Sequence, residues 1–464
     1  MSDSPSLWQT IREAVRGSTA NFTEISIGRA VMLLAIPMVL EMLMESVFAV
    51  ADVFFVGRLG ADAVATVGIT ESLMTIIYAV AMGLGVGAAA TVARRIGEQD
   101  PDGAAKAAAQ SIIFGLAMGA GIGTVAIVFA PDMLRLMGAS ADVVRTGSTF
   151  ARVMIGASGG VTLLFLINAV FRGAGDAAIA MRVLWIANAI NIVLGPCLIF
   201  GLGPFPRMGV TGAAVGTSIG RWCGVLIQVY CLTRPDARVR LRWRHVRLDR
   251  IVMKGILRIS GSAMFQNFVG TASYMAIVRV VAIFGSAAVA GNTIGIRIIL
   301  FALLPSFGVS NAAVTLVGQN LGAGKPDRAE AAAWRAALYN ALCMAAIGAV
   351  FLAFAPTLIG VFTSDPAVIP YGVQCLRIVS AGFLFCGYGM VLTAAFNGAG
   401  DTRTPTLINI CCFWLMEIPL AWILTNTFGM GPRGAFIGLS IGFSMPAFVS
   451  AWLFRQGRWK TRTV

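Results

Sequence analysis

The sequence predicts an all-α integral membrane protein with twelve transmembrane helices in two six-helix bundles. Of its 464 residues, 58% are hydrophobic and only 12% are charged, whereas a soluble domain carries about 25% charged residues. Apolar runs of about 20 residues, the length that crosses a bilayer, recur along nearly the whole chain. The second half of the chain also repeats the first. No hydrophilic stretch is long enough for a separate soluble domain, so the whole chain is expected to belong to the membrane class.

Twelve apolar segments are expected to cross the membrane. Their limits are 30–56, 64–92, 108–130, 148–171, 183–201, 210–232, 256–284, 288–317, 333–357, 371–396, 406–427 and 434–454. They give a first lobe over 30–233 and a second lobe over 256–455, joined by a basic linker at 234–255. Residues 1–29 are expected to be a cytoplasmic N-terminal segment, and residues 456–464 a cytoplasmic tail. The N-terminal segment lacks an apolar core and a small-residue cleavage site, so it is not expected to be a cleavable signal.

Positive charge is distributed unevenly along the chain. The net charge is +14, and nine Lys and Arg residues lie between Arg234 and Arg258. With both termini in the cytoplasm, the inner segments hold 25 Lys and Arg residues and the outer loops hold five, as the positive-inside rule requires. The charge therefore predicts a membrane protein with both termini in the cytoplasm, whose basic linker is expected to contact anionic lipid headgroups; the expected location is the bacterial inner membrane. A nucleic-acid partner is not expected.

The cysteines and the single histidine suggest no further chemistry. None of the eight cysteines forms a C-x-x-C pair, so neither disulfides nor a metal site of cysteine or histidine ligands is expected. His245 lies in the basic linker and is expected to be a surface residue. The sequence predicts no cofactor apart from a coupling ion.

The two halves of the chain match at one constant offset over most of their length. The clearest copy is FRGAGD at 171–176 against FNGAGD at 396–401. Later the offset becomes slightly shorter, where Gly209, Gly216 and Gly220 match glycines of the second half. Because each repeat has an even number of spans, both halves insert the same way up. They are expected to be related by a pseudo-two-fold axis along the membrane normal, with a substrate cavity near the midplane.

Four acidic residues lie inside the predicted spans of the first half. Glu41, Glu45 and Asp52 are in the first span, and Glu71 is in the second. An ionisable side chain in a span costs roughly 2.5–3.5 kcal/mol on insertion scales, so each of these acids is a functional candidate. At about 100° per residue, the three acids of the first span share one helical face. That face is expected to line a wet cavity.

An alternative role for these acids is to neutralise arginines within the spans, namely Arg152, Arg221, Arg279, Arg297 and Arg377. The repeat argues against a purely structural role. The positions that correspond to the four acids are Gln266, Gly270, Ile277 and Ile296. The second half has one acid well inside a span, Glu417. The acids of the first half are therefore expected to couple transport to a cation.

Pro37 shows the same difference between the halves, because its counterpart is Ser262. A proline inside a span frees a carbonyl group and kinks the helix. Pro37 is therefore expected to be a hinge, about four turns from Asp52.

Asp52 is expected to bind either a proton or, with neighbouring acids, a Na⁺ ion, and the residues do not decide between the two. Polar side chains and flexible methionines are expected to complete the cavity, since thioethers repack around varied apolar ligands. These residues are Tyr78, Asn168, Asn188, Asn191, Thr217, Gln266, Asn267, Met38 and Met74.

Several runs of the sequence resemble the multidrug and toxic compound extrusion (MATE) family. They are IPMVLEMLMESVFAVADVFFVGRLGADAVATVGI, the FRGAGD and FNGAGD pair, and NIVLGPCLIFG, and the likeness covers residues 25–455. The resemblance implies twelve helices in two bundles and a cation antiporter that expels small organic, often cationic, compounds. The chain is expected to work as a monomer.

The spacing from Pro37 to Asp52 is similar to that of the prokaryotic DinF-like branch. The resemblance implies that Asp52 is the protonation site and that the first helix bends at Pro37. The fifth helix of that branch often reads N-x-x-x-D-P; here Asn191 matches the Asn, but Gly195 replaces the Asp. Glu41, Glu45 or Glu71 would then supply the missing acid. The NorM-like branch has acids in helices seven and ten, and the corresponding spans here have none, so a sodium site of that kind is not expected.

The sequence thus predicts an exporter of small organic cations in exchange for H⁺ or Na⁺, by alternating access of the two lobes. One alternative is a flippase or exporter of a lipid-linked or metabolite substrate in the same superfamily. A remote alternative is an integral-membrane transferase, which would need paired acids at a loop, or histidines. Asp176 and Asp401 are loop acids, but each ends a glycine-rich turn present in both halves and is expected to be a structural cap. The chain is therefore not expected to be an enzyme.

Overall fold

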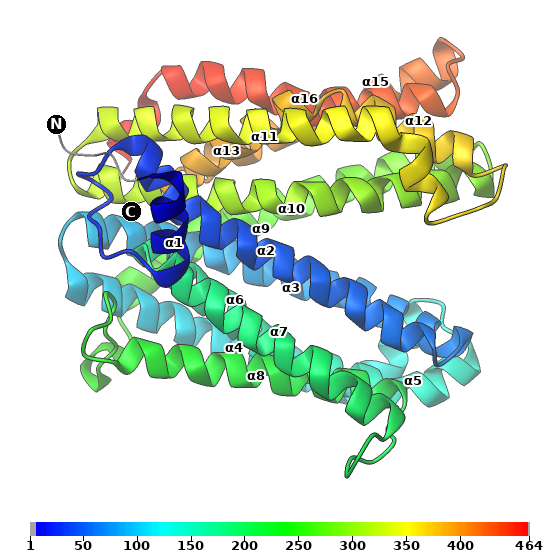
Figure 1. Ribbon diagram of the computed structural model, residues 1–464, viewed down its shortest axis with the longest axis horizontal. Helices are drawn as coiled ribbons and strands as arrows, with labels where there is room; N and C mark the ends of the chain where they lie inside the picture. Colours follow the sequence, from blue (N-terminus) through cyan, green and yellow to red (C-terminus); the bar gives the residue numbers. More distant parts are fainter. Residues whose placement is uncertain (1–5, 463–464) are drawn as a thin grey trace. The chain divides into compact units, whose positions relative to one another are not determined.

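The computed structural model describes residues 6–462, and within that range the chain forms helices and loops but no strand (Figure 1). Each of the twelve predicted spans coincides closely with one helix or with a run of consecutive helices. The predicted all-α membrane fold is confirmed. The helices extend beyond most of the predicted limits, because apolar periodicity ends before the helical backbone does.

The helices of the first half follow one another with short connections. They are α1 (Leu7–Arg16), α2 (Ile27–Gly57), α3 (Ala61–Gly97), α4 (Pro101–Leu136), α5 (Ala141–Gly156), α6 (Ser158–Ala174), α7 (Ala177–Phe200) and α8 (Val210–Thr233). A short 3₁₀ turn, η1 (Trp243–Val246), lies in the linker. Helices α5 and α6 together form the fourth span, Ala141–Ala174. Helix α1 was not predicted, because it is short and lies in a polar segment.

The helices of the second half repeat this order. They are α9 (Arg250–Ala282), α10 (Ser286–Gly322), α11 (Pro326–Gly360), α12 (Ile369–Ser380), α13 (Phe383–Gly398), α14 (Arg403–Asn409), α15 (Ile418–Trp422) and α16 (Pro432–Arg455). Two π-helical segments, η2 (Ile410–Glu417) and η3 (Ile423–Thr427), flank α15, and a 3₁₀ turn, η4 (Arg458–Thr461), follows α16. Helices α12 and α13 meet at an angle of 56° and form one bent span.

Eleven of the twelve spans are apolar and long enough to cross a membrane when the bent pair is taken as one. The twelfth is α9, which has 33 residues but a more polar composition. Its uncharged polar residues are Ser260, Ser262, Gln266, Asn267, Thr271, Ser273 and Tyr274, and it also carries Arg250, Lys254, Arg258 and Arg279. Polar side chains within a span are usually directed into a protein interior or a wet cavity.

The contacts within the chain define two compact units. The N-terminal unit comprises Arg12–Thr19 and Leu40–Met264, and the C-terminal unit comprises Met1–Ile11, Ala20–Val39 and Phe265–Val464. Membership therefore changes inside α2, after Val39, and inside α9, after Met264. These two positions correspond to each other at the main offset of the sequence repeat. The lobe limits at 30–233 and 256–455 stay a prediction.

Small residues set the packing within the N-terminal unit. Helix α3 packs against α6, and α7 packs against α8. A Cβ atom added to Gly119 of α4 would lie 2.5 Å from the Cα of Gly159 in α6, and one added to Gly173 would lie 2.6 Å from the carbonyl oxygen of Ala89. Contacts this short require glycine, because only then can the backbones of membrane helices approach each other so closely.

The C-terminal unit packs α10 and α11 against α13, and α13 against α16. The predicted tail is folded onto this unit. Trp459 is fully buried and stacks on Phe454 at 4.3 Å between ring centroids. Lys460 pairs with Asp327 at 2.9 Å and with Glu330 at 2.7 Å. Hydrogen bonds to Glu330 and Asp327 raise the pKa of Lys460, so the ammonium group stays charged at neutral pH.

Candidate coupling site

A buried arginine organises the acidic face of α2 within the N-terminal unit. Arg221 of α8 is 2% exposed, and its Nη2 lies 2.6 Å from Oε1 of Glu45. The amide of Asn188 donates a hydrogen bond to the other carboxylate oxygen of Glu45 at 3.0 Å. The guanidinium also lies over the rings of Phe48 and Phe165. Glu45 therefore has a charged partner and a fixed position.

Asp52 and Glu71 have no such partner. Both side chains are half-buried, and among residues 6–462 neither forms an ion pair within 4 Å. Arg221 attracts both carboxylates electrostatically, while Asp52 and Glu45 repel the charge of Glu71. Three carboxylates thus share one guanidinium, and the cluster has a formal charge of −2 when all three are ionised. Excess negative charge in a membrane helix favours binding of protons or cations.

Glu41 belongs to a separate polar group. Its side chain is fully buried; its Oε1 lies 2.9 Å from Nη1 of Arg172 and accepts a hydrogen bond from Asn168 at 3.0 Å. Gln228 in turn donates to the amide oxygen of Asn168 at 2.6 Å. The carboxylate of Glu41 is therefore neutralised within the fold, as the alternative structural role requires.

The C-terminal unit contains an uncharged version of this pair. At the main offset of the repeat, Glu41 corresponds to Gln266 and Arg172 to Asn397. Asn397 donates a hydrogen bond to Gln266 at 3.4 Å. Both members of the ion pair are thus replaced by amides in the second copy. An ion pair and an amide pair thus fill the corresponding buried position of the two units, and in each pair one oxygen, Oε2 of Glu41 or Oδ1 of Asn397, has no hydrogen-bond partner among the described residues.

Of the other predicted cavity residues of the N-terminal unit, some form polar or aromatic contacts and others pack in apolar surroundings. Asn191 donates to Thr217 at 2.7 Å, and the ring of Tyr78 packs edge-on against Phe165 at 5.9 Å. Tyr78 interacts electrostatically with Arg221 and with the three carboxylates that share it. Met74 is buried in an apolar cluster. Gly195, which stands where an aspartate was expected, lies against Gly216 at a close approach of α7 and α8.

Three predicted cavity residues belong to the C-terminal unit instead. Met38 is fully buried. Its backbone lies so close to Gly308 that a Cβ atom added to this glycine would be 2.9 Å from the carbonyl carbon of Met38. Gln266 pairs with Asn397 as described, and Asn267 is half-buried.

The arginines of the spans have different environments from one another. Of the five expected partners for the acids, only Arg221 is buried; Arg152, Arg279, Arg297 and Arg377 are exposed. Arg172, the partner of Glu41, was not among the candidates. A signal for it existed in the repeat, because Glu41 and Arg172 both change to amides in the second copy.

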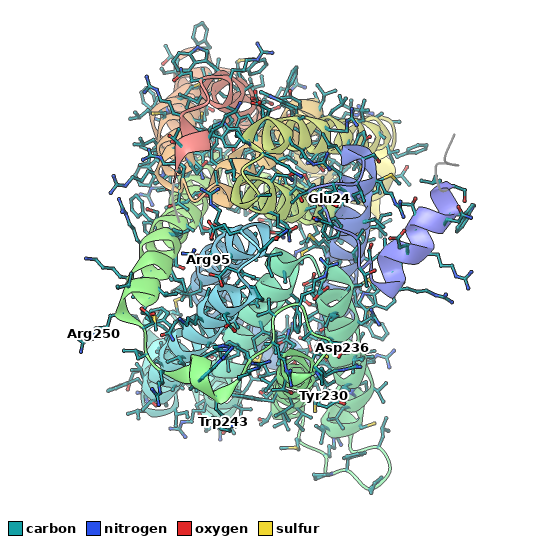
Figure 2. All side chains as sticks on the ribbon, turned by 90° about the vertical axis from the view of Figure 1, so that its left-hand side faces the viewer. Glu24, Arg95, Tyr230, Asp236, Trp243 and Arg250 are labelled. Carbon is teal, nitrogen blue, oxygen red and sulfur yellow. The ribbon has the colours of Figure 1, made fainter. Side chains whose placement is uncertain are left out.

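Two expectations for the loops need correction, the first for His245 and the second for Asp176. His245 is 2% exposed and is not a surface residue. Its Nδ1 accepts a hydrogen bond from the backbone N–H of Arg242 at 3.2 Å, its Nε2 lies 3.4 Å from Oδ1 of Asp102, and Arg244 pairs with the same Asp102 oxygen at 2.6 Å. Figure 2 shows the linker, in which Asp236 and Trp243 are labelled, and its 3₁₀ turn η1 contacts α4 of the N-terminal unit. The linker is thus partly anchored, although Trp243 itself is 91% exposed.

The repeated glycine-rich turns differ in how they use their aspartates. Asp401 accepts hydrogen bonds from the backbone N–H and hydroxyl of Thr404, as a helix cap does. Asp176 makes no such capping bond and instead lies 3.1 Å from Nε of Arg238 in the linker. Burial raises the pKa of Asp176 to about 6, although Arg238 and Arg182 oppose this. The expected structural cap therefore holds for Asp401, and Asp176 ties the turn to the linker.

Comparison with known proteins agrees with this architecture. The family model MatE matches residues 37–197 and again residues 262–423, so its two matches begin at positions that correspond in the repeat. The chain is 28% identical over 432 residues to the "Probable multidrug resistance protein NorM" of Thermotoga maritima, with 93% of each chain covered. It is 24% identical to the "FAD transporter" of Shewanella oneidensis, over 89% of this chain and 91% of that one. A solved structure described as "Crystal structure of MATE in the bent conformation" matches with a TM-score of 0.87 and 28% identity, covering 96% of this chain and 97% of that one.

Proposed function

Because the chain belongs to the MatE family of multidrug efflux transporters, we propose that it exports small organic cations in exchange for protons. One observation carries the proposal: Arg221 pairs with Glu45 at 2.6 Å, while Asp52 and Glu71 lie within its electrostatic influence without an ion pair of their own. Glu45 is fixed by its ion pair, so Asp52 and Glu71 are the carboxylates free to exchange a proton for a positively charged substrate. The chain would act in the bacterial inner membrane with both termini in the cytoplasm.

The exchange follows from charge balance within the cluster. With Asp52 and Glu71 ionised, the cluster attracts an organic cation from the cytoplasmic side. One proton arriving from the outside and bound by Asp52 or Glu71 weakens that attraction and releases the cation. One charge moved across the membrane potential is worth about 2.3 kcal/mol per 100 mV, and a pH gradient adds to this. Protonation and substrate binding thus compete for the same negative charge.

Sodium is the alternative coupling ion, and the side chains favour the proton. Among the described residues, no group of three or more His, Cys, Asp or Glu side chains is placed to hold a metal ion. A Na⁺ site would have to use backbone carbonyls and hydroxyl groups in addition to one or two carboxylates. A proton needs only one carboxylate.

A second substrate class comes from the relative named "FAD transporter". A flavin dinucleotide carries negative phosphates, and the acidic cluster would repel it. The charge of the cluster therefore favours cations. Export of a cationic dye but not of FAD would support organic cations as the substrate class. Export of FAD but not of the dye would show that the substrate is an anionic dinucleotide.

The test is export by purified protein in proteoliposomes under a proton gradient alone and then a sodium gradient alone. The proton gradient is expected to drive efflux of a cationic dye. Asp52→Asn should abolish this uphill export, while the melting temperature stays within a few degrees of that of the unsubstituted protein. Asp365→Asn, in the exposed loop before α12, is the matched control. Unchanged uphill export by the Asp52 variant would remove Asp52 from the coupling mechanism.

A further inference from the structure

We propose that Glu417 is a second proton-carrying site, located in the C-terminal unit, so that two protons enter for each organic cation that leaves. The inference rests on the proposed function, because it assigns a second proton to the same exchange. It is carried by three observations: the isolation of the Glu417 carboxyl group, its place in the repeat, and the π-helical backbone that ends at this residue.

The carboxyl group of Glu417 is buried without a counterion. The residue is 1% exposed, and among the described residues no Lys or Arg pairs with it. From α9, the hydroxyl group of Ser273 lies 3.3 Å from Oε1 and equally 3.3 Å from the backbone carbonyl oxygen of Phe413, so the two acceptors share its one hydrogen. From α16, the facing position is Gly442, and the titratable group nearby on its own segment is the thiol of Cys412. Oε2 is buried and has no hydrogen-bond partner in the structure.

An ionised carboxylate is therefore poorly accommodated at this position. Burying an unpaired charge costs several kcal/mol even after relaxation of the protein, whereas a neutral carboxylic acid costs far less. In this conformation the site holds the protonated acid. It can release the proton to water only when the surroundings of Glu417 change, which is the property required of a proton carrier in alternating access.

The helix contacts place Glu417 at the counterpart of a polar position in the first copy. In the N-terminal unit, Gly212 and Gly216 of α8 lie against Leu198 and Gly195 of α7, and a Cβ atom added to Gly220 would lie closest to the carbonyl oxygen of Ala187, with Asn191 next to it at 3.5 Å. In the C-terminal unit, the matching glycines, Gly434, Gly438 and Gly442, lie against Leu424, Ala421 and Glu417. The order and spacing of the three contacts are the same in both units. Glu417 thus occupies the position of Asn191, which belongs to the polar network of the N-terminal unit.

The carboxyl group of Glu417 packs directly against Gly442. A Cβ atom added to Gly442 would lie 2.1 Å from Oε2 and 2.6 Å from Cδ of Glu417. Any larger residue at position 442 would displace the carboxyl group. The glycine therefore accommodates the carboxyl group directly.

The backbone around Glu417 provides a way to move the group. The π-helical segment η2 ends at Glu417, and a second one, η3, begins after α15. π-Helical turns are rare and occur frequently at functional sites. Converting one π turn to an α turn shifts the register by one residue, which rotates the side chains beyond it by about 100°. Such a shift would carry Glu417 away from Ser273 and Gly442.

The number of protons determines whether transport carries net charge. One proton exchanged for one monovalent cation is electroneutral, so a membrane potential alone cannot drive it. Two protons exchanged for one monovalent cation move one net positive charge inward. The second case responds to a potential even when the pH is equal on both sides.

The experiment measures efflux of ethidium from proteoliposomes, first with a potassium diffusion potential at equal pH and then with a pH gradient at zero potential. For the unsubstituted protein, both conditions are expected to drive efflux. Glu417→Gln, which imitates the neutral acid, should lose the response to potential and keep the response to the pH gradient. A Glu417 variant that responds to the potential as the unsubstituted protein does would overturn the inference, as would an unsubstituted protein without any potential response.

A second variant covers the case in which Glu417→Gln does not fold. Ser273→Ala keeps the carboxyl group and removes its one hydrogen-bond donor, so the proton should leave less readily. The pH at which the potential response is half-maximal should then rise; an unchanged pH would contradict the inference. No dye efflux by the unsubstituted protein under either gradient would instead refute the proposed function, so the two failures are distinguishable.

Discussion

Glu41 and Arg172 offer a test of whether a buried acid in the first helix is structural, because the second copy provides the substitution. Glu41→Gln deprives Arg172 of the carboxylate that lies 2.9 Å away. Removing one partner of a buried ion pair costs about 3–5 kcal/mol. Combining it with Arg172→Asn reproduces the Gln266–Asn397 pair of the C-terminal unit and should recover most of that loss. Tryptophan fluorescence during thermal unfolding in detergent measures the effect.

The exposed pair Arg145 and Asp142 is the control for this exchange. Its side chains are 79% and 76% exposed, so replacing both with Asn should change the melting temperature very little. If the double variant at 41 and 172 is less stable than either single variant, the two copies do not use the pair in equivalent ways.

Single residues show where sequence patterns stop being informative. The polarity of Glu45, Asp52 and Glu71 identified them as costly residues within a membrane span, but the sequence could not show that Arg221 pairs with Glu45 and leaves the other two without an ion pair. Helical periodicity indicates which face of a helix a residue occupies, and not which neighbouring helix that face meets. His245 illustrates the same limit, since its contacts are with Arg242 of the linker and with Asp102 of α4, which is far from it in the sequence.

At the scale of elements, Pro37 lies within α2. Val39, two residues later, is the last residue of α2 that belongs to the C-terminal unit. A proline removes one backbone hydrogen bond and weakens the helix at that point. Pro37→Ser copies Ser262 and restores the N–H group. We expect the variant to be at least as stable and to export dye several-fold more slowly, because the helix bends less readily. Initial efflux rates and melting temperatures measured in parallel separate the two effects.

Pro131 is the matched control for Pro37, because it is an interior proline whose counterpart, Pro356, is also a proline. Pro131→Ala is expected to leave the export rate nearly unchanged. Equal slowing by both substitutions would show that Pro37 has no special part in bending.

The apolar runs of the sequence predicted twelve helical segments, and eleven of them are apolar and long enough to match the thickness of a bilayer. Hydropathy could not predict the 56° bend between α12 and α13 or the π-helical segments around α15. Those features depend on local hydrogen-bond register, which leaves the apolar composition unchanged. Helix α1 was missed for a different reason: it is amphipathic, with one polar and one apolar face, and it is too short to give a hydropathy peak.

For the whole molecule, the least apolar span provides the sharpest test of topology. Helix α9 has 33 residues but falls short of the apolar composition of the other spans, and the repeat requires it to cross as α2 does. If it crosses, the short loop after Ala282 lies outside and the basic linker before Arg250 lies in the cytoplasm. Alkaline phosphatase, which is active only when exported, should be active when fused after Phe284 and inactive when fused after Arg242. A fluorescent protein fused to the C-terminus should fluoresce, because an even number of spans returns both termini to the cytoplasm.

Inactive phosphatase after Phe284 would mean that α9 does not cross. The second half would then have an odd number of spans, and its Glu417 could not occupy the membrane position that corresponds to Asn191.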